Sequence, residues 1–82
     1  MPTSQQAKEF TRDYLGTLKA KGMKNTFRSA REIARIMGID ADKAIRFVVS
    51  AKANGYMCDD AIPMPSYINF PTLFKVWEEH IV

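Results

Sequence analysis

The fold of this chain is decided by the stretch Ala30-Arg-Glu-Ile-Ala-Arg-Ile-Met-Gly-Ile-Asp-Ala-Asp-Lys-Ala-Ile-Arg-Phe-Val-Val-Ser-Ala-Lys-Ala-Asn-Gly-Tyr-Met57. Its first part has apolar residues at three- and four-residue steps, which is the spacing of one face of an α-helix. Ser29 and Glu32 fit a capping box, in which each side chain accepts a hydrogen bond from the backbone N–H of the other. Gly38 suits the left-handed position that commonly ends a helix. These features predict a helix over residues 29–37.

A second helix is predicted almost immediately afterwards, over residues 41–54. Asp40 precedes it and can cap its free N–H groups, and the carboxylate charge suits the positive end of the helix dipole. Lys43, Arg46 and Ser50 are expected to point outward. The inner face is expected to carry Ala41, Ala44, Ile45, Phe47, Val48 and Ala51.

The flanking segments complete a single domain over residues 1–82. A helix is predicted over residues 4–21, because an amphipathic stripe follows another capping box there. Two short runs of strand-forming residues, 56–58 and 67–70, predict an antiparallel hairpin. A proline then suits the first turn of a last helix over residues 71–80. The expected fold class is therefore mainly α with a small β-hairpin.

Charge is distributed unevenly along the chain, whose net value is +3. Residues 1–57 carry eleven basic and five acidic side chains, whereas residues 58–82 carry one basic and four acidic ones. A basic body suggests a polyanionic partner such as nucleic acid. The alternative interpretation is a solvated surface with a mild excess of lysine.

Composition also disfavours several classes of protein. No apolar run approaches the roughly 20 residues that cross a bilayer, and the polar N-terminus is unlike a signal peptide. Cys58 is the only cysteine and His80 the only histidine, so we expect no metal site and no cofactor. We recognise no nucleophile with a paired base and no glycine-rich phosphate loop, so we do not expect an enzyme. A reducing cytoplasmic setting is the simplest expectation.

The quoted stretch resembles the helix-turn-helix core of bacterial winged-helix regulators. Their pattern is an Ala-x-x-Ile-Ala helix, a glycine turn, an apolar residue, and a capped second helix with an apolar-x-x-x-Gly-Tyr/Leu exit. The positions of this chain that fit the pattern are Glu32-Ile33-Ala34, Gly38, Ile39, Asp40, Phe47, Val48, Gly55 and Tyr56. The resemblance implies a winged helix-turn-helix domain of a small bacterial or phage regulator type, with the hairpin as its wing.

The same resemblance implies transcription regulation through duplex DNA, with the helix over residues 41–54 in the major groove. The expected DNA-binding residues lie on that helix and beside it: Arg28, Arg31, Arg35, Lys43, Arg46 and Ser50. A homodimer is expected, because such regulators commonly double their contacts across a two-fold site.

Two features depart from the family pattern. Asp42 brings a second negative charge to the first turn of the expected recognition helix. Asp59-Asp60 make the expected wing acidic where wings are usually basic. These carboxylates keep a second hypothesis open, in which the chain is a winged-helix protein-interaction module, an inhibitor or assembly factor, that does not bind DNA.

Overall fold

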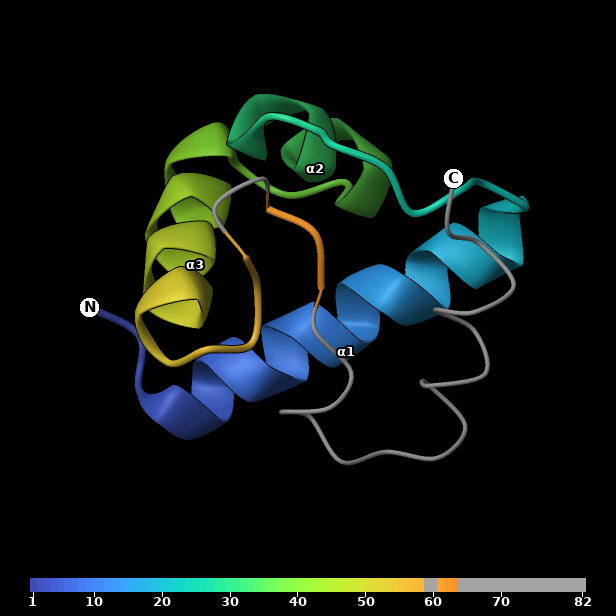
Figure 1. Cartoon of the computed structure of the whole chain (residues 1–82). Coiled ribbons are helices and arrows are strands. Elements are labelled where there is room, and N and C mark those ends of the chain that lie inside the picture. Colours follow the sequence, from blue (N-terminus) through green and yellow to red (C-terminus); the bar gives the residue numbers. More distant parts are fainter. Residues whose placement is uncertain (59–60, 64–82) are drawn as a thin grey trace.

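The computed structural model describes residues 1–58 and 61–63, and this part of the chain is mainly helical (Figure 1). Its helices are α1 (Ser4–Lys21), α2 (Ala30–Met37) and α3 (Ala41–Ala53). They confirm the first three helices expected from the sequence, to within one residue at each end. The fourth expected helix, over residues 71–80, lies outside the described residues.

Each helix begins where a side chain accepts backbone N–H groups of its first turn. The Thr3 hydroxyl accepts from the Gln6 N–H at 3.1 Å, and the Gln6 side-chain oxygen accepts from the Thr3 N–H at 2.9 Å. Ser29 and Glu32 form the same reciprocal box at α2, at 3.2 and 3.3 Å. The Asp40 carboxylate accepts from two N–H groups at the start of α3, at 3.0 and 3.3 Å. Local capping therefore fixes all three helix starts.

A turn of three residues, Gly38 to Asp40, joins α2 to α3. Gly38 has a φ of 68°, and its N–H donates to the Ala34 carbonyl. The Ile39 N–H donates to the same oxygen at 3.0 Å. Because the left-handed conformation at Gly38 ends α2 abruptly, α3 can cross α2 instead of continuing its axis (Figure 1).

The core lies where α1 packs against both α2 and α3. The Phe10 ring of α1 meets the Phe47 ring of α3 at a centroid distance of 5.1 Å and a tilt of 36°. Such tilted aromatic pairs add to the stabilisation that burial provides. The buried apolar residues are Ala7, Phe10, Tyr14, Leu15, Leu18, Ile33, Ala34, Ala44, Val48, Ala51, Met57 and Ala61.

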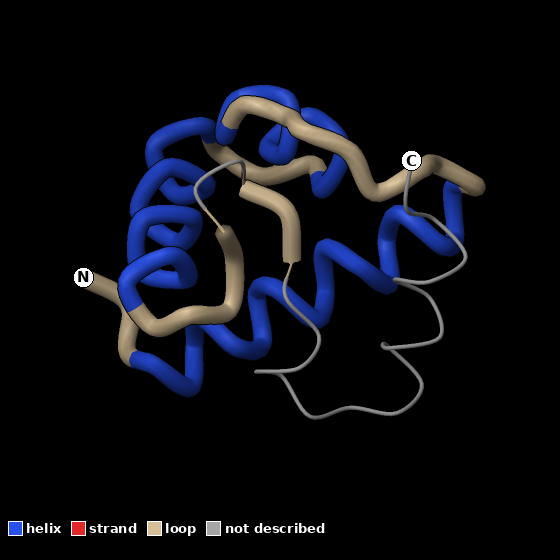
Figure 2. The backbone as a smooth tube through the Cα atoms, viewed as in Figure 1, coloured by secondary structure: helices blue, strands red, loops and turns tan. Residues whose placement is uncertain are grey.

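The expected hairpin is not confirmed by the described residues. Between Met57 and Pro63 there is one isolated antiparallel bridge, and the Cys58 N–H donates to the Ile62 carbonyl at 3.0 Å. Figure 2 shows no strand in the described part of the chain. Proline has no N–H to donate, so the pairing cannot extend through Pro63 as a regular ladder. The expected strand over residues 67–70 lies outside the described residues.

The orientation of α3 about its own axis differs from the one expected. Ser50 was expected to point outward, and this is wrong, because the residue is only 2% exposed. Its hydroxyl donates to the Pro2 carbonyl at 3.0 Å, so the chain ahead of α1 covers this side of α3. Ile45 was expected on the inner face, but it is 39% exposed. The buried arc of α3 is thus shifted toward Ser50 and away from Ile45.

Candidate functional site

Helix α3 presents an outward face of mixed chemistry. Asp42, Ile45, Arg46 and Val49 are all exposed there. At about 100° of rotation per residue, they fall within an arc of about 100°. Ile45 is 39% exposed and Val49 is 48% exposed, and they lie one helical turn apart. We call these two residues the apolar stripe of α3.

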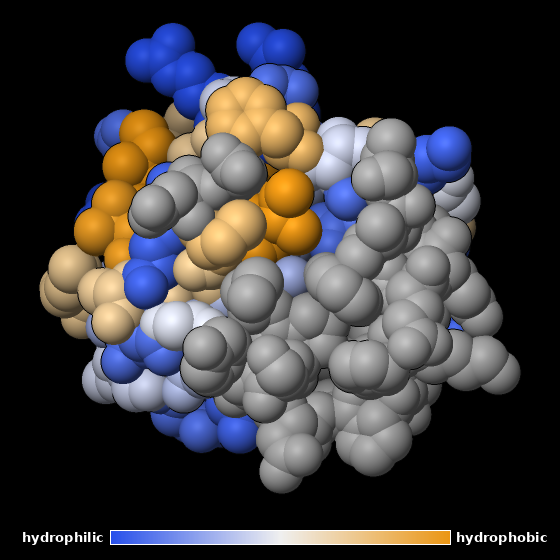
Figure 3. Space-filling view, viewed as in Figure 1, coloured by the Kyte–Doolittle hydropathy of each residue, from blue (hydrophilic) through white to orange (hydrophobic). Residues whose placement is uncertain are grey.

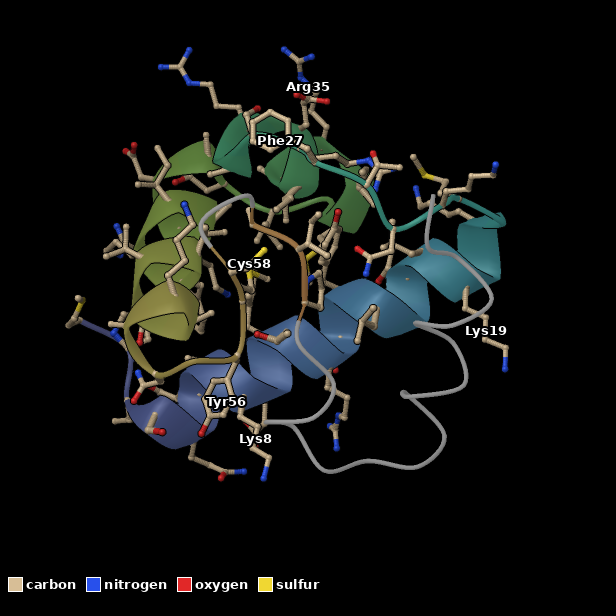
Figure 4. All side chains as sticks on the ribbon, in the orientation of Figure 1. Lys8, Lys19, Phe27, Arg35, Tyr56 and Cys58 are labelled. Carbon is tan, nitrogen blue, oxygen red and sulfur yellow. The ribbon has the colours of Figure 1, made fainter. Side chains whose placement is uncertain are left out.

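The side of the apolar stripe that faces α2 is bordered by two arginines. A hollow of about 360 Å³ separates the outer sides of α2 and α3. Arg31 and Arg35 line it from α2, and Asp42 and Ile45 line it from α3. Arg35 projects from α2 away from α1 (Figure 4). Arg31 and Arg35 therefore lie beside one edge of the apolar stripe, across the hollow from Asp42.

The other side of the apolar stripe is bordered by Arg46 and Lys43, in that order around α3. The Lys43 ammonium lies 5.8 Å from the centre of the Phe47 ring, so it sits on the side of α3 that faces α1. Figure 3 shows hydrophobic side chains at the left edge of the molecule, over α3, and hydrophilic ones projecting at the top, over α2. The stripe thus has cations on both of its sides.

Most of these cations are not neutralised by neighbouring carboxylates. Among residues 1–58 and 61–63, no ion pair within 4.0 Å involves Arg31, Arg35, Lys43 or Arg46. Asp40 is already engaged as the cap of α3. Asp42 is the one carboxylate of the outward face of α3. The face that α2 and α3 share is therefore net positive and open to an anionic partner.

Arg28 has a different environment from the other expected site residues. Its guanidinium donates to the Tyr14 hydroxyl at 3.2 Å, and the side chain is half-buried. Burial raises the pKa of Tyr14, whereas the hydrogen bond and the charge of Arg28 act to lower it. The charge of Glu32 raises it further. Arg28 thus ties the segment before α2 to α1, a contact that no spacing in the sequence indicates.

The six expected DNA-binding residues therefore separate into three groups. Arg31, Arg35, Lys43 and Arg46 are exposed and surround the outward face of α3. Arg28 is engaged with Tyr14, and Ser50 is buried. Sequence reasoning missed the outward position of the apolar stripe. Ile45 follows Asp42 by three residues and Val49 follows Arg46 by three, so helical geometry places the apolar residues on the same face as the charged ones. This spacing could have indicated that the stripe faces outward.

The described part of the chain is thus a small, mainly helical domain with a basic face on α2 and α3. Within residues 1–58 and 61–63, no three His, Cys, Asp or Glu side chains gather as metal ligands would. None of the described helices has the length and apolar character that crossing a bilayer requires. Comparison with known protein families, with curated proteins and with solved structures found no match to this chain.

Proposed function

We propose that this chain is a small winged helix-turn-helix domain that binds duplex DNA through α3 and regulates transcription. The observation that carries the proposal is the outward face of α3, with uncompensated cations on both sides of it. The three-residue turn between α2 and α3 supports it, because DNA-binding helix-turn-helix units join their helices in this way.

The dimensions of α3 suit the major groove. A helix of 13 residues is about 20 Å long, and with side chains it is about 10–12 Å across. The major groove of B-DNA is about 12 Å wide. In this arrangement Arg46 lies toward the base edges, where an arginine pairs with guanine. Arg31, Arg35 and Lys43 lie toward the phosphates, where they position the domain without reading sequence.

A salt titration with charge variants tests this proposal. The variants are the double change Arg31→Ala with Arg35→Ala, which removes two positive charges, and Lys19→Ala, a control that removes one. Lys19 is also exposed but lies near the end of α1 that is distant from α3 (Figure 4). We expect the double variant to bind a mixed-sequence duplex more weakly, with a salt slope smaller by about one for each phosphate that the protein no longer neutralises.

Fluorescence anisotropy of a labelled duplex between about 50 and 200 mM salt provides the readout, because affinity changes steeply over this range. Lys19→Ala should retain the wild-type slope. A reduction in Lys19→Ala half as large as that in the double variant, in proportion to the charges removed, would show that binding follows net charge alone. That result would contradict a site on α2 and α3.

A second candidate function, a protein-interaction module, is favoured by the exposure of Ile45 and Val49. Apolar side chains surrounded by charged ones are also the composition of a protein interface. Capture of a partner from host lysate, with and without nuclease, separates the two. A partner that survives nuclease treatment, together with no salt-dependent binding of DNA, would replace the DNA-binding proposal.

The homodimer expected for a regulator of this size belongs to the same proposal. One 13-residue helix reaches few base pairs, so two copies across a two-fold site would double the specific contacts. We expect the contact to use Phe74, Trp77 or Ile81 of the last predicted helix, and these residues lie outside the described part of the chain. Light scattering of the free protein and of its duplex complex measures the stoichiometry directly.

A further inference from the structure

The apolar stripe, Ile45 and Val49, is unusual for the centre of a face with cations on both sides. Both residues are well exposed, although the chain has a core in which apolar side chains are fully buried. Arg31 and Arg35 lie on one side of the stripe, and Arg46 lies on the other. The face thus has an apolar stripe with cations on both sides, and the Asp42 carboxylate lies between Val49 and Arg46 around the helix.

This arrangement matches the cross-section of a major groove. The groove has a phosphate backbone along each margin and base edges along its floor. The one apolar group on that floor is the 5-methyl group of thymine. The other exposed groups are hydrogen-bond donors and acceptors, and covering them with Ile or Val would leave them without water and without partners. The stripe is therefore compatible with thymine and unfavourable opposite the polar edges of other bases.

The spacing of the stripe fits two methyl contacts about two base-pair steps apart. Residues four apart on a helix are separated by about 6 Å along its axis. Base pairs are about 3.4 Å apart along the duplex, so the stripe spans about two steps. Arg46 is exposed on the same outward face, beside the stripe.

We propose that Ile45 and Val49 read thymine 5-methyl groups in the major groove, so that the DNA sites of this protein contain A·T pairs about two steps apart, beside the base contacted by Arg46. This inference rests on the proposed binding of duplex DNA. It assigns specificity to the apolar residues of α3, while the surrounding cations supply affinity that is independent of sequence.

The test uses duplexes that differ only in the methyl group. Alternating poly(dA-dT) and poly(dA-dU) have the same phosphates and the same hydrogen-bonding groups in the major groove. We expect wild-type protein to bind the thymine duplex about tenfold more tightly, which is the effect of burying two methyl groups. Poly(dG-dC) with 5-methylcytosine, which carries a methyl at the equivalent position, should bind more tightly than unmethylated poly(dG-dC).

The variant Ile45→Ser with Val49→Ser should bind the methylated and unmethylated duplexes equally, and the single change Val49→Ser should remove part of the difference. Both residues are exposed, so we expect the variants to fold, and thermal melting checks this. Phe27→Ser is the matched control, because Phe27 is 65% exposed and lies outside α3. It should keep the wild-type preference for the methylated duplexes.

Two results would overturn the inference, and they are distinguishable. If the wild-type protein binds all four duplexes in a salt-dependent manner but without regard to the methyl group, DNA binding stands and methyl reading by Ile45 and Val49 is wrong. If no duplex is bound at any salt concentration, the proposed function fails and the inference fails with it.

Discussion

Ser50 shows at the scale of one residue how a polar side chain comes to lie on the inner side of a helix. Its hydroxyl is satisfied by the Pro2 carbonyl at 3.0 Å, so its burial leaves no unpaired hydroxyl donor. The Asn54 side chain adds a hydrogen bond to the Ser50 carbonyl at 2.8 Å. Ser50 therefore joins the N-terminal residues to the end of α3 and does not face a ligand.

The first prediction concerns this hydroxyl. Ser50→Ala removes the hydrogen bond and leaves the Pro2 carbonyl without its partner, so we expect the free energy of unfolding to fall by about 1 kcal/mol. Urea denaturation measures the change. The affinity for duplex DNA should not change, because the side chain is 2% exposed. A weaker affinity in a variant of unchanged stability would contradict the inward placement of Ser50.

Asn25 is the opposite case, a buried amide without partners. The residue is 2% exposed, and neither its side-chain oxygen nor its nitrogen has a hydrogen-bond partner among the described residues. An unsatisfied buried polar group costs about 1–3 kcal/mol. We predict that Asn25→Leu, which keeps the branched shape and the number of side-chain heavy atoms but has no polar atoms, raises the free energy of unfolding by about that amount. Thermal melting of the variant at a lower temperature than wild type would show that the Asn25 amide has a partner that the described residues do not include.

At the scale of the element, the three helices could be predicted because their signals are local. The capping boxes at Thr3 and Ser29 and the acidic cap at Asp40 each act within four residues, and each has the expected geometry. The rotation of α3 could not be predicted in the same way. Apolar residues cover much of its circumference, and the contact of Ser50 with Pro2, 48 residues away, shows which arc is covered.

The hairpin shows the same limit of local signals, because strand propensity does not reveal which residue a strand will pair with. The strand-forming residues near Met57 favour pairing, but the pairing partner found in the described residues is Pro63, which supports one bridge and no ladder. Of the candidate site, the exposed cations of α2 and α3 could be predicted from helical spacing. The engagement of Arg28 with Tyr14 depends on how α1 packs, and spacing along the chain carries no signal for it.

The turn between α2 and α3 gives a prediction at this scale. Gly38 has a φ of 68°, and an added Cβ would meet no atom within 4 Å, so the cost of Gly38→Ala is backbone strain alone. We expect a decrease of about 1–2 kcal/mol in the free energy of unfolding, measured by urea denaturation. Gly16→Ala is the matched control, because Gly16 lies within α1 and also has open space at its Cβ. That change should stabilise the domain by about 0.5–1 kcal/mol. Equal effects of the two changes would contradict the left-handed turn.

At the scale of the whole molecule, each helix has a buried face and an exposed one. α2 and α3 contribute to the core together with α1, and on their outward faces they expose the cations that border the apolar stripe. The outward face of α3 is separate from the core, because changes there leave the Phe10–Phe47 contact intact. Variants of the site are therefore expected to fold, and their binding can be interpreted without a correction for unfolding.

The central claim is that α2 and α3 together form a surface that contacts duplex DNA. Backbone amide chemical shifts of the labelled protein, recorded as duplex is added, test it most directly. We predict shift changes in residues 31–35 and 38–49 that diminish as salt is raised, and unchanged shifts around Lys19 at the far end of α1. Changes spread evenly over α1, or confined to it, would contradict the claim.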